Sequence, residues 1–96
     1  MEVAKALASP TRVNILEWLK DTEGNFVSRR TGDLGPAGVC ASLIAGKAGI
    51  SAPTASRHLD VLRRAGLIQS ERRAGWNFHR RDPRGLEIAH RLLEDI

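Results

Sequence analysis

Arginine is the residue type in this sequence whose chemistry is easiest to interpret. All eight basic residues between positions 51 and 85 are arginines, against three carboxylates in that stretch, and the whole chain carries a net charge of +4. A guanidinium group is a planar fork that matches a guanine edge or the oxygens of a phosphate. This concentration predicts a polyanionic partner, although a solvated arginine-rich surface would show the same composition.

Metal-ligating residue types occur at two further places. Cys40 is the only cysteine, so no internal disulfide can form, and a lone thiol of this kind is more often a small buried side chain than a redox or metal sensor. Glu87, His90 and Glu94 stand at i, i+3 and i+7, which places them on one side of a helix. The polar face of any amphipathic helix has the same spacing, so we expect no metal and no cofactor.

Catalysis and membrane insertion are not expected. The sequence contains no glycine-rich phosphate loop, no nucleophile motif and no obvious pair of catalytic carboxylates, so we do not expect an enzyme. Charged residues interrupt the first 20 positions, which argues against a signal peptide or a membrane span. Together with the single cysteine, this predicts a soluble cytoplasmic protein that does not contact membranes.

The element expected to position the first of the arginines is a helix between Ser51 and Gly66. Ser51 is a good N-cap, Pro53 suits the first turn, and glycine can end the helix. The apolar stripe of this helix consists of Ala55, Leu59 and Leu62. A shorter helix is expected over 39–48, ended by Gly49, so that a three-residue turn separates the two. This is the helix-turn-helix pattern, whose second helix reads DNA.

The candidate reading residues lie near the start of the second helix, outside its apolar stripe. They are Ser51, Ala52, Pro53, Thr54, Ser56 and Arg57. Arg57 is suited to a bidentate contact with guanine, and the hydroxyl groups can reach bases or phosphates. His58 adjoins the inner face and is expected to pack against the domain.

A β-hairpin is expected directly after this helix. Residues 67–73 and 76–81 flank Ala74-Gly75, and apolar Trp76 and Phe78 alternate with polar residues. Four arginines flank this projecting hairpin and are candidates for contact with phosphate or an adjacent minor groove: Arg72, Arg73, Arg80 and Arg81. His79 is a further candidate for phosphate contact.

The remaining segments complete one domain over residues 1–96. Two short helices are expected to meet at Ser9-Pro10, and residues 21–38 form a long glycine-rich connection. Residues 84–96 form a helix whose apolar face is wider than a single core contact needs, which suggests a dimer. The prediction is a mainly α (α+β) winged helix-turn-helix fold with about five helices and one β-hairpin wing, acting on double-stranded DNA as a homodimer.

Three blocks of the sequence resemble the arsenic-repressor (ArsR) family of bacterial winged helix-turn-helix regulators. They are Lys5–Arg12 with Ile15-Leu16, then Ser51–Leu59 with Val61-Leu62 and Ala65–Ile68, and finally Gly75-Trp76 with Arg80 and Asp82-Pro83. The resemblance implies a homodimeric transcriptional repressor that binds a palindromic operator and releases it on a signal. The family's thiolate metal site has two cysteines separated by one residue, where this chain has Cys40 alone. The upstream ligands of the family's C-terminal His/carboxylate site are also absent from residues 82–85.

Two alternatives remain open at this stage. The winged domain can instead be a protein-interaction module whose basic face docks an acidic partner. In a third interpretation the chain binds DNA but is controlled through the 21–38 connection, by a partner or a small ligand.

Overall fold

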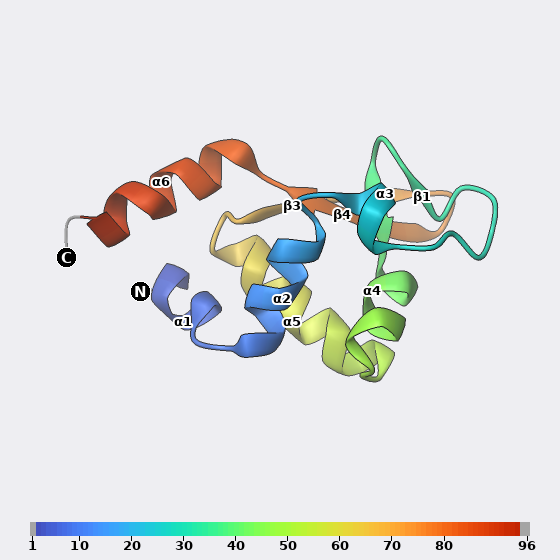
Figure 1. Cartoon of the computed structure of the whole chain (residues 1–96), viewed down its shortest axis with the longest axis horizontal. Helices are drawn as coiled ribbons and strands as arrows, with labels where there is room; N and C mark the ends of the chain where they lie inside the picture. Colours follow the sequence, from blue (N-terminus) through green and yellow to red (C-terminus); the bar gives the residue numbers. More distant parts are fainter. Residues whose placement is uncertain (1, 95–96) are drawn as a thin grey trace.

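The computed structural model describes residues 2–94, which form a winged helix-turn-helix (Figure 1). The elements in chain order are α1 (Glu2–Leu7), α2 (Pro10–Trp18), α3 (Thr22–Asn25), β1 (Leu34–Gly35), β2 (Gly38–Cys40), α4 (Ala41–Ala48), α5 (Ala52–Arg64), β3 (Ile68–Arg73), β4 (Trp76–Arg81) and α6 (Pro83–Glu94). The predicted fold class is confirmed, with one more helix and two more strands than expected.

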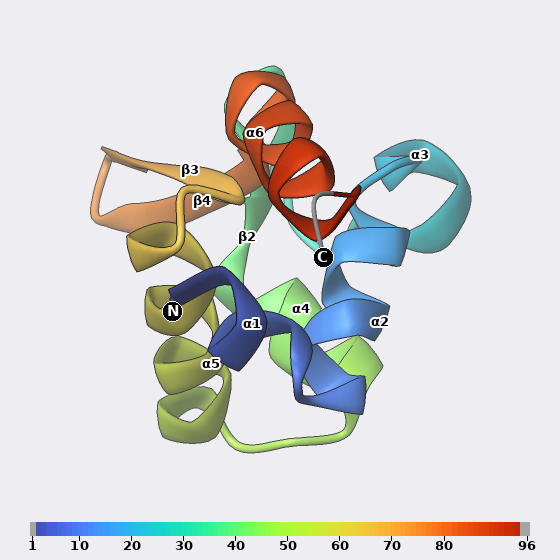
Figure 2. The same cartoon turned by 90° about the vertical axis from the view of Figure 1, so that its left-hand side faces the viewer.

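Four helices and the sheet supply most of the core. Figure 2 shows α1 and α2 lying across α4 and α5. The break between α1 and α2 is where the sequence predicts it, because Ser9 accepts a hydrogen bond from the Arg12 N–H and Pro10 begins α2. The largest fully buried side chains of the core are Ile15, Val39, Ile44, Leu62 and Leu67.

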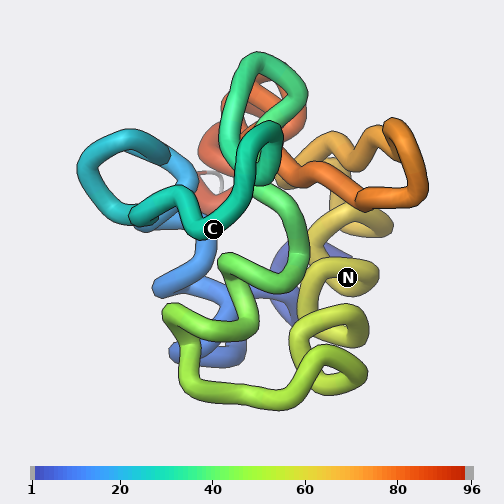
Figure 3. Tube along the Cα trace, turned by 90° about the vertical axis from the view of Figure 1, so that its right-hand side faces the viewer, coloured from blue at the N-terminus to red at the C-terminus, as the bar shows by residue number. Residues whose placement is uncertain are grey.

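The strands form one antiparallel sheet in the order β1-β2-β4-β3. The β3–β4 hairpin, with Ala74-Gly75 at its tip, is called the wing below. β2 pairs with β4 through Val39–His79 and Cys40–Phe78, so the sheet joins the wing to the segment before α4. Figure 3 shows the β1–β2 segment and the wing as neighbouring projections.

The 21–38 connection is therefore more ordered than its composition indicates. It contains α3, capped by Asp21, and most of the β1–β2 hairpin. The expectation of a helix from residue 39 was wrong by two positions, since Val39 and Cys40 belong to β2 and the helix starts at Ala41. Backbone pairing with β4, which is distant in sequence, holds these two residues in the extended conformation.

The C-terminal helix leaves the sheet at a tight contact. The Asp82 carboxylate accepts hydrogen bonds from the Arg84 and Gly85 N–H groups, and a side chain on Gly85 would overlap the backbone carbonyl of Gly66. Beyond this point α6 extends away from the body (Figure 1) and buries only Ala89 among residues 83–94. Within residues 2–94 no helix has both the length and the apolar character to cross a bilayer.

Candidate nucleic-acid interface

The turn between α4 and α5 sets the direction of the second helix. Gly49 adopts the left-handed conformation (φ 67°) and its N–H bonds back to the last turn of α4. Ser51 then caps α5, its hydroxyl oxygen accepting from the Thr54 N–H at 3.3 Å. The predicted apolar stripe is confirmed, because Ala55, Leu59 and Leu62 are each no more than 2% exposed. Burial of this stripe turns the opposite side of the helix start outward.

The outward residues form what we call the α5 edge: Ser51, Ala52, Pro53, Thr54, Ser56 and Arg57. All are exposed except Thr54, which is half-buried. The Ser51 hydroxyl donates to Thr54 Oγ1 at 2.9 Å, and Arg57 Nη2 donates to the same oxygen at 3.4 Å. These contacts orient the Arg57 guanidinium along the helix start. The structure thus brings together all six sequence-predicted reading residues.

The tip of the wing presents two arginines to solvent. Ala74 (φ 50°) and Gly75 (φ 83°) form a turn with two positive φ angles, the geometry favoured for two-residue hairpins. Arg72 and Arg73, paired across the hairpin with Asn77 and Trp76, are exposed. Arg73 also pairs with the Glu71 carboxylate.

The other two wing arginines lie at its base and are engaged within the chain. Arg80 donates to Gln69 Oε1 at 2.7 Å and to the Ala37 carbonyl at 3.3 Å. Arg81 is half-buried and donates to the Leu16 carbonyl at the end of α2, at 2.7 Å. The sequence grouped these four arginines together, whereas the structure separates an exposed pair at the tip from a structural pair at the base.

His79 does not face solvent as expected for a phosphate contact. It is 7% exposed between β2 and β3, and its Nδ1 hydrogen-bonds with the Ser70 hydroxyl at 2.8 Å. Burial lowers the pKa of His79 to about 4, so the imidazole is neutral at physiological pH. The alternation of Trp76 and Phe78 with polar residues placed His79 outside, but the structure places His79 beside Ala41 of α4 and Leu59 of α5, which line the same cavity.

Arg12 links the first helix to α5, which the sequence did not reveal. Its guanidinium donates to the carbonyls of Lys5 and Ala6 at 2.8 Å each and to His58 Nδ1 at 3.1 Å. Burial, followed by the charges of Arg12 and Arg57, lowers the pKa of His58. His58 is half-buried and packs against the domain, as predicted.

A small groove separates α5 from the wing. This cavity of about 210 Å³ is lined by α5 residues including Ser56, Asp60 and Arg63 and by wing residues including Ser70 and Asn77. Asp60 is ion-paired with Arg63 (2.6 Å), and it also pairs with Arg64 at 3.0 Å. Those pairings lower the pKa of Asp60. The acid of this groove is therefore neutralised by neighbouring arginines.

Within residues 2–94, the metal-ligating residue types singled out in the sequence contact neighbours in the chain. Cys40 is buried and its sulfur contacts the Ser42 hydroxyl at 3.1 Å. His90 pairs with Glu94 at 2.8 Å, while Glu87 pairs with Arg91. In the described part of the chain no three His, Cys, Asp or Glu side chains gather in a way that would hold a metal ion.

This geometry, a capped helix with an exposed start, a short turn before it and a basic wing after it, defines a winged helix-turn-helix DNA-binding domain. The model of a protein family described as "Helix-turn-helix domain" matches residues 7–71 of this chain. Over its whole length the chain is 38% identical to the uncharacterized HTH-type transcriptional regulator YbzH of Bacillus subtilis, of which it covers 97%. The chain therefore belongs to the helix-turn-helix family of transcriptional regulators.

Solved structures share the fold. A possible transcriptional regulator for arsenical resistance superposes with a TM-score of 0.74 at 22% identity, over 99% of this chain and 83% of that one. An ArsR family transcriptional regulator superposes with a TM-score of 0.72 at 20% identity, over 98% and 87%. At the level of the fold, these likenesses confirm the resemblance to the ArsR family seen in the sequence.

Proposed function

We propose that the chain is a homodimeric, ArsR-like repressor that binds an inverted-repeat operator in double-stranded DNA. In this proposal the α5 edge enters the major groove, with Arg57 reading a guanine and Ser51, Thr54 and Ser56 contacting bases or phosphates. The wing tip, through Arg72 and Arg73, contacts the phosphate backbone or an adjacent minor groove.

The observation that carries the proposal is the division of α5 into two sides. Its stripe of Ala55, Leu59 and Leu62 is almost fully buried, whereas the α5 edge is exposed and carries one cation. A helix N-terminus also presents unpaired N–H groups that favour phosphate. The small side chains of Ala52 and Pro53 let this end approach DNA closely.

The apolar face of α6 supports the homodimer. Ile88 is 51% exposed and Leu92 and Leu93 are each 43% exposed, on a helix that projects from the body (Figure 1). A second copy packing on this face would remove these side chains from water. A two-fold dimer presents two recognition helices about 34 Å apart, one turn of DNA, so the operator is an inverted repeat.

The test is selection of bound fragments from genomic DNA with the purified protein, followed by hydroxyl-radical footprinting. We expect two protected half-sites with centres about 10 base pairs apart or a multiple of that spacing. Insertion of five base pairs between the half-sites places them on opposite sides of the duplex and should abolish tight binding. Unselective recovery of fragments, or tight binding that survives the insertion, would contradict the proposal.

A further inference from the structure

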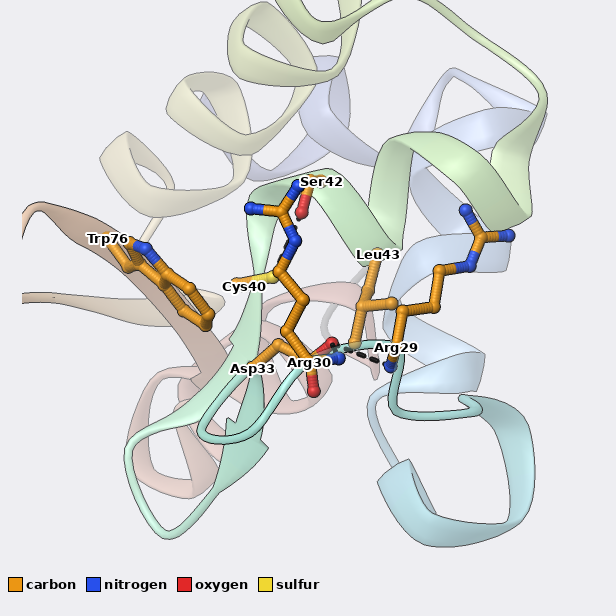
Figure 4. Close-up of a pocket in the computed structure, with 7 residues that line it drawn as sticks. All are labelled: Arg29, Arg30, Asp33, Cys40, Ser42, Leu43 and Trp76. Atoms are coloured by element: carbon orange, nitrogen blue, oxygen red, sulfur yellow. Dashed lines mark hydrogen bonds between the residues drawn. The ribbon is translucent and has the colours of Figure 1, made fainter.

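A cavity of about 360 Å³ lies on the side of α4 away from the core helices, between the 28–33 segment, the start of α4 and the wing (Figure 4). Its lining residues are Arg29, Arg30, Asp33, Cys40, Ser42, Leu43 and Trp76. The volume falls in the range of small-molecule sites, which are apolar clefts with a few polar groups that converge. The described DNA-binding surface does not use this cavity.

The lining of the cavity carries two arginines against one carboxylate, so its net charge is positive. Neither Arg29 nor Arg30 forms an ion pair within residues 2–94. In Figure 4 the Arg30 guanidinium lies over Cys40 beside Ser42, whereas Arg29 points the other way, toward Gly46. The first turn of α4, which contains Ser42, has no acidic residue and no side-chain cap, so its end of the helix dipole adds to the positive potential.

The single acid in the lining is already committed to the backbone. Asp33 is 2% exposed and accepts from the Ser28 hydroxyl at 2.6 Å and from the N–H groups of Arg29 and Arg30 at 2.8 and 2.9 Å. Its carbonyl accepts from the Cys40 N–H at 3.1 Å, which ties the 28–33 segment to the start of α4. Asp33 thus fixes the wall that carries Arg30 and leaves the guanidinium free for another anion.

The two large apolar residues of the lining, Leu43 and Trp76, lie on either side of Arg30 in Figure 4 and belong to the DNA-binding elements. Leu43 lies on α4, the first helix of the helix-turn-helix, and Trp76 lies on β4, paired with Arg73 at the wing tip. Trp76 packs against the core and meets Phe78 with ring centroids 6.0 Å apart. An indole beside a guanidinium suits a ligand with one flat apolar part and one negative end.

We propose that this cavity binds a small organic carboxylate with an apolar body, whose carboxylate pairs with Arg30 and whose body lies between Leu43 and Trp76. Because the ligand touches both α4 and the wing, its binding changes the affinity for DNA; that regulatory part rests on the function proposed above. Coupling between two sites is typically about 5- to 150-fold in affinity. Because Arg29, Arg30 and Asp33 belong to the 21–38 connection, this site would place control of DNA binding in that connection.

The test uses benzoate and phenylacetate as probes, with benzamide and phenylacetamide as their neutral counterparts and inorganic phosphate as a competitor. Binding is measured by NMR titration of the full chain at up to about 10 mM probe, which detects even millimolar affinities. We expect saturable binding of at least one carboxylate, with shifts at the amides of Cys40, Leu43 and the Trp76 indole. The neutral probes, benzamide and phenylacetamide, should bind at least about tenfold more weakly than the carboxylates.

Arg30→Gln should reduce carboxylate affinity at least about tenfold, whereas Arg91→Gln, which removes the same charge from the far end of α6, should leave it unchanged. Equal binding to Arg30→Gln and wild type would overturn the proposal. So would the absence of saturable carboxylate binding, equal binding of benzamide and phenylacetamide, or competition by phosphate as strong as that of the carboxylates.

Operator affinity is measured with and without probe in the same samples. Carboxylate binding without any DNA binding would refute the proposed function alone, and DNA affinity unaffected by a bound carboxylate would refute only the regulatory role.

Discussion

Arg57 is the only charged residue of the α5 edge, and its guanidinium is held at the helix start by Thr54. A bidentate contact to guanine discriminates against the wrong base by about 1–3 kcal/mol. Arg57→Ala should therefore lower the ratio of operator to random-DNA affinity by that amount, as measured by fluorescence anisotropy. Lys20→Ala, which removes an exposed charge just after α2, should leave the ratio unchanged. An unchanged ratio for Arg57→Ala would assign base reading to another residue.

His79 makes stability depend on pH. Its pKa is about 4 in the folded protein against an ordinary value of 6.5, so the unfolded chain binds the proton first as pH falls. The contribution of the neutral imidazole is present above pH 6.5 and is lost between pH 6.5 and about 4. It amounts to about 3 kcal/mol at most.

Urea unfolding between pH 7 and 4 checks this prediction. Asn can retain a hydrogen bond to Ser70 but does not titrate, so His79→Asn should show a flatter decline in the free energy of unfolding than wild type. The lowered pKa of His58 contributes in the same direction in both proteins. The pKa values of Asp33, Asp60 and Asp82 are lowered from 3.8, so these groups reduce the free energy of unfolding only as the pH falls toward 3.8 and below. Parallel curves for the two proteins would show that His79 is not the group responsible.

At the scale of elements, the wing separates stability from DNA binding. Arg81 at the base donates to the Leu16 carbonyl, and a hydrogen bond from a charged group contributes about 1.5–3 kcal/mol. Arg81→Ala should lower the free energy of unfolding by about that amount, as measured by urea denaturation. Arg73→Ala at the exposed tip should leave stability within about 0.5 kcal/mol of wild type and weaken binding to operator and random DNA alike. Unchanged stability of Arg81→Ala together with a clear loss of stability in Arg73→Ala would contradict this division of the wing.

Elements with local signals were predictable from the sequence. Ser9-Pro10, Gly49 and Ser51 mark helix ends by their own backbone preferences, and the Ala55, Leu59 and Leu62 stripe follows from helical spacing. These signals were sufficient to place the α5 edge, and the Ala74-Gly75 turn between two strand-like segments placed the wing.

Features that depend on contacts distant in sequence were not predictable. β1 and β2 have two and three residues, too few for an alternating pattern, and they form because β2 pairs with β4. His79 is buried beside residues of α4 and α5 that are distant in sequence, and the partner of Arg81 is 65 positions away. A single sequence holds no record of these long-range contacts, so the arginines of the wing looked equivalent and the cavity beside Arg30 was not foreseen.

At the scale of the whole molecule, the structure extends 43 Å along an axis that α6 lengthens, and that helix buries little of its apolar face within the chain (Figure 1). Ile88→Lys should place a charge in the proposed dimer contact and shift the protein toward monomer, as measured by sedimentation equilibrium. Val27→Lys is the matched control, since Val27 is 83% exposed on the connection after α3. A dimer of unchanged stability in Ile88→Lys would exclude the exposed face of α6 as the contact.

The central claim is that this chain reads DNA as a dimer through α5 and contacts the phosphate backbone through arginines. The most direct test is the salt dependence of binding to a selected inverted repeat. Affinity is measured by anisotropy between 50 and 200 mM salt, beside a scrambled duplex of equal length. With about 6–10 phosphate contacts per dimer, affinity should fall by about 10³–10⁵ over that range, and the inverted repeat should bind more tightly than the scrambled duplex at every salt concentration. Affinity that is independent of salt, or equal for the two duplexes, would contradict the account.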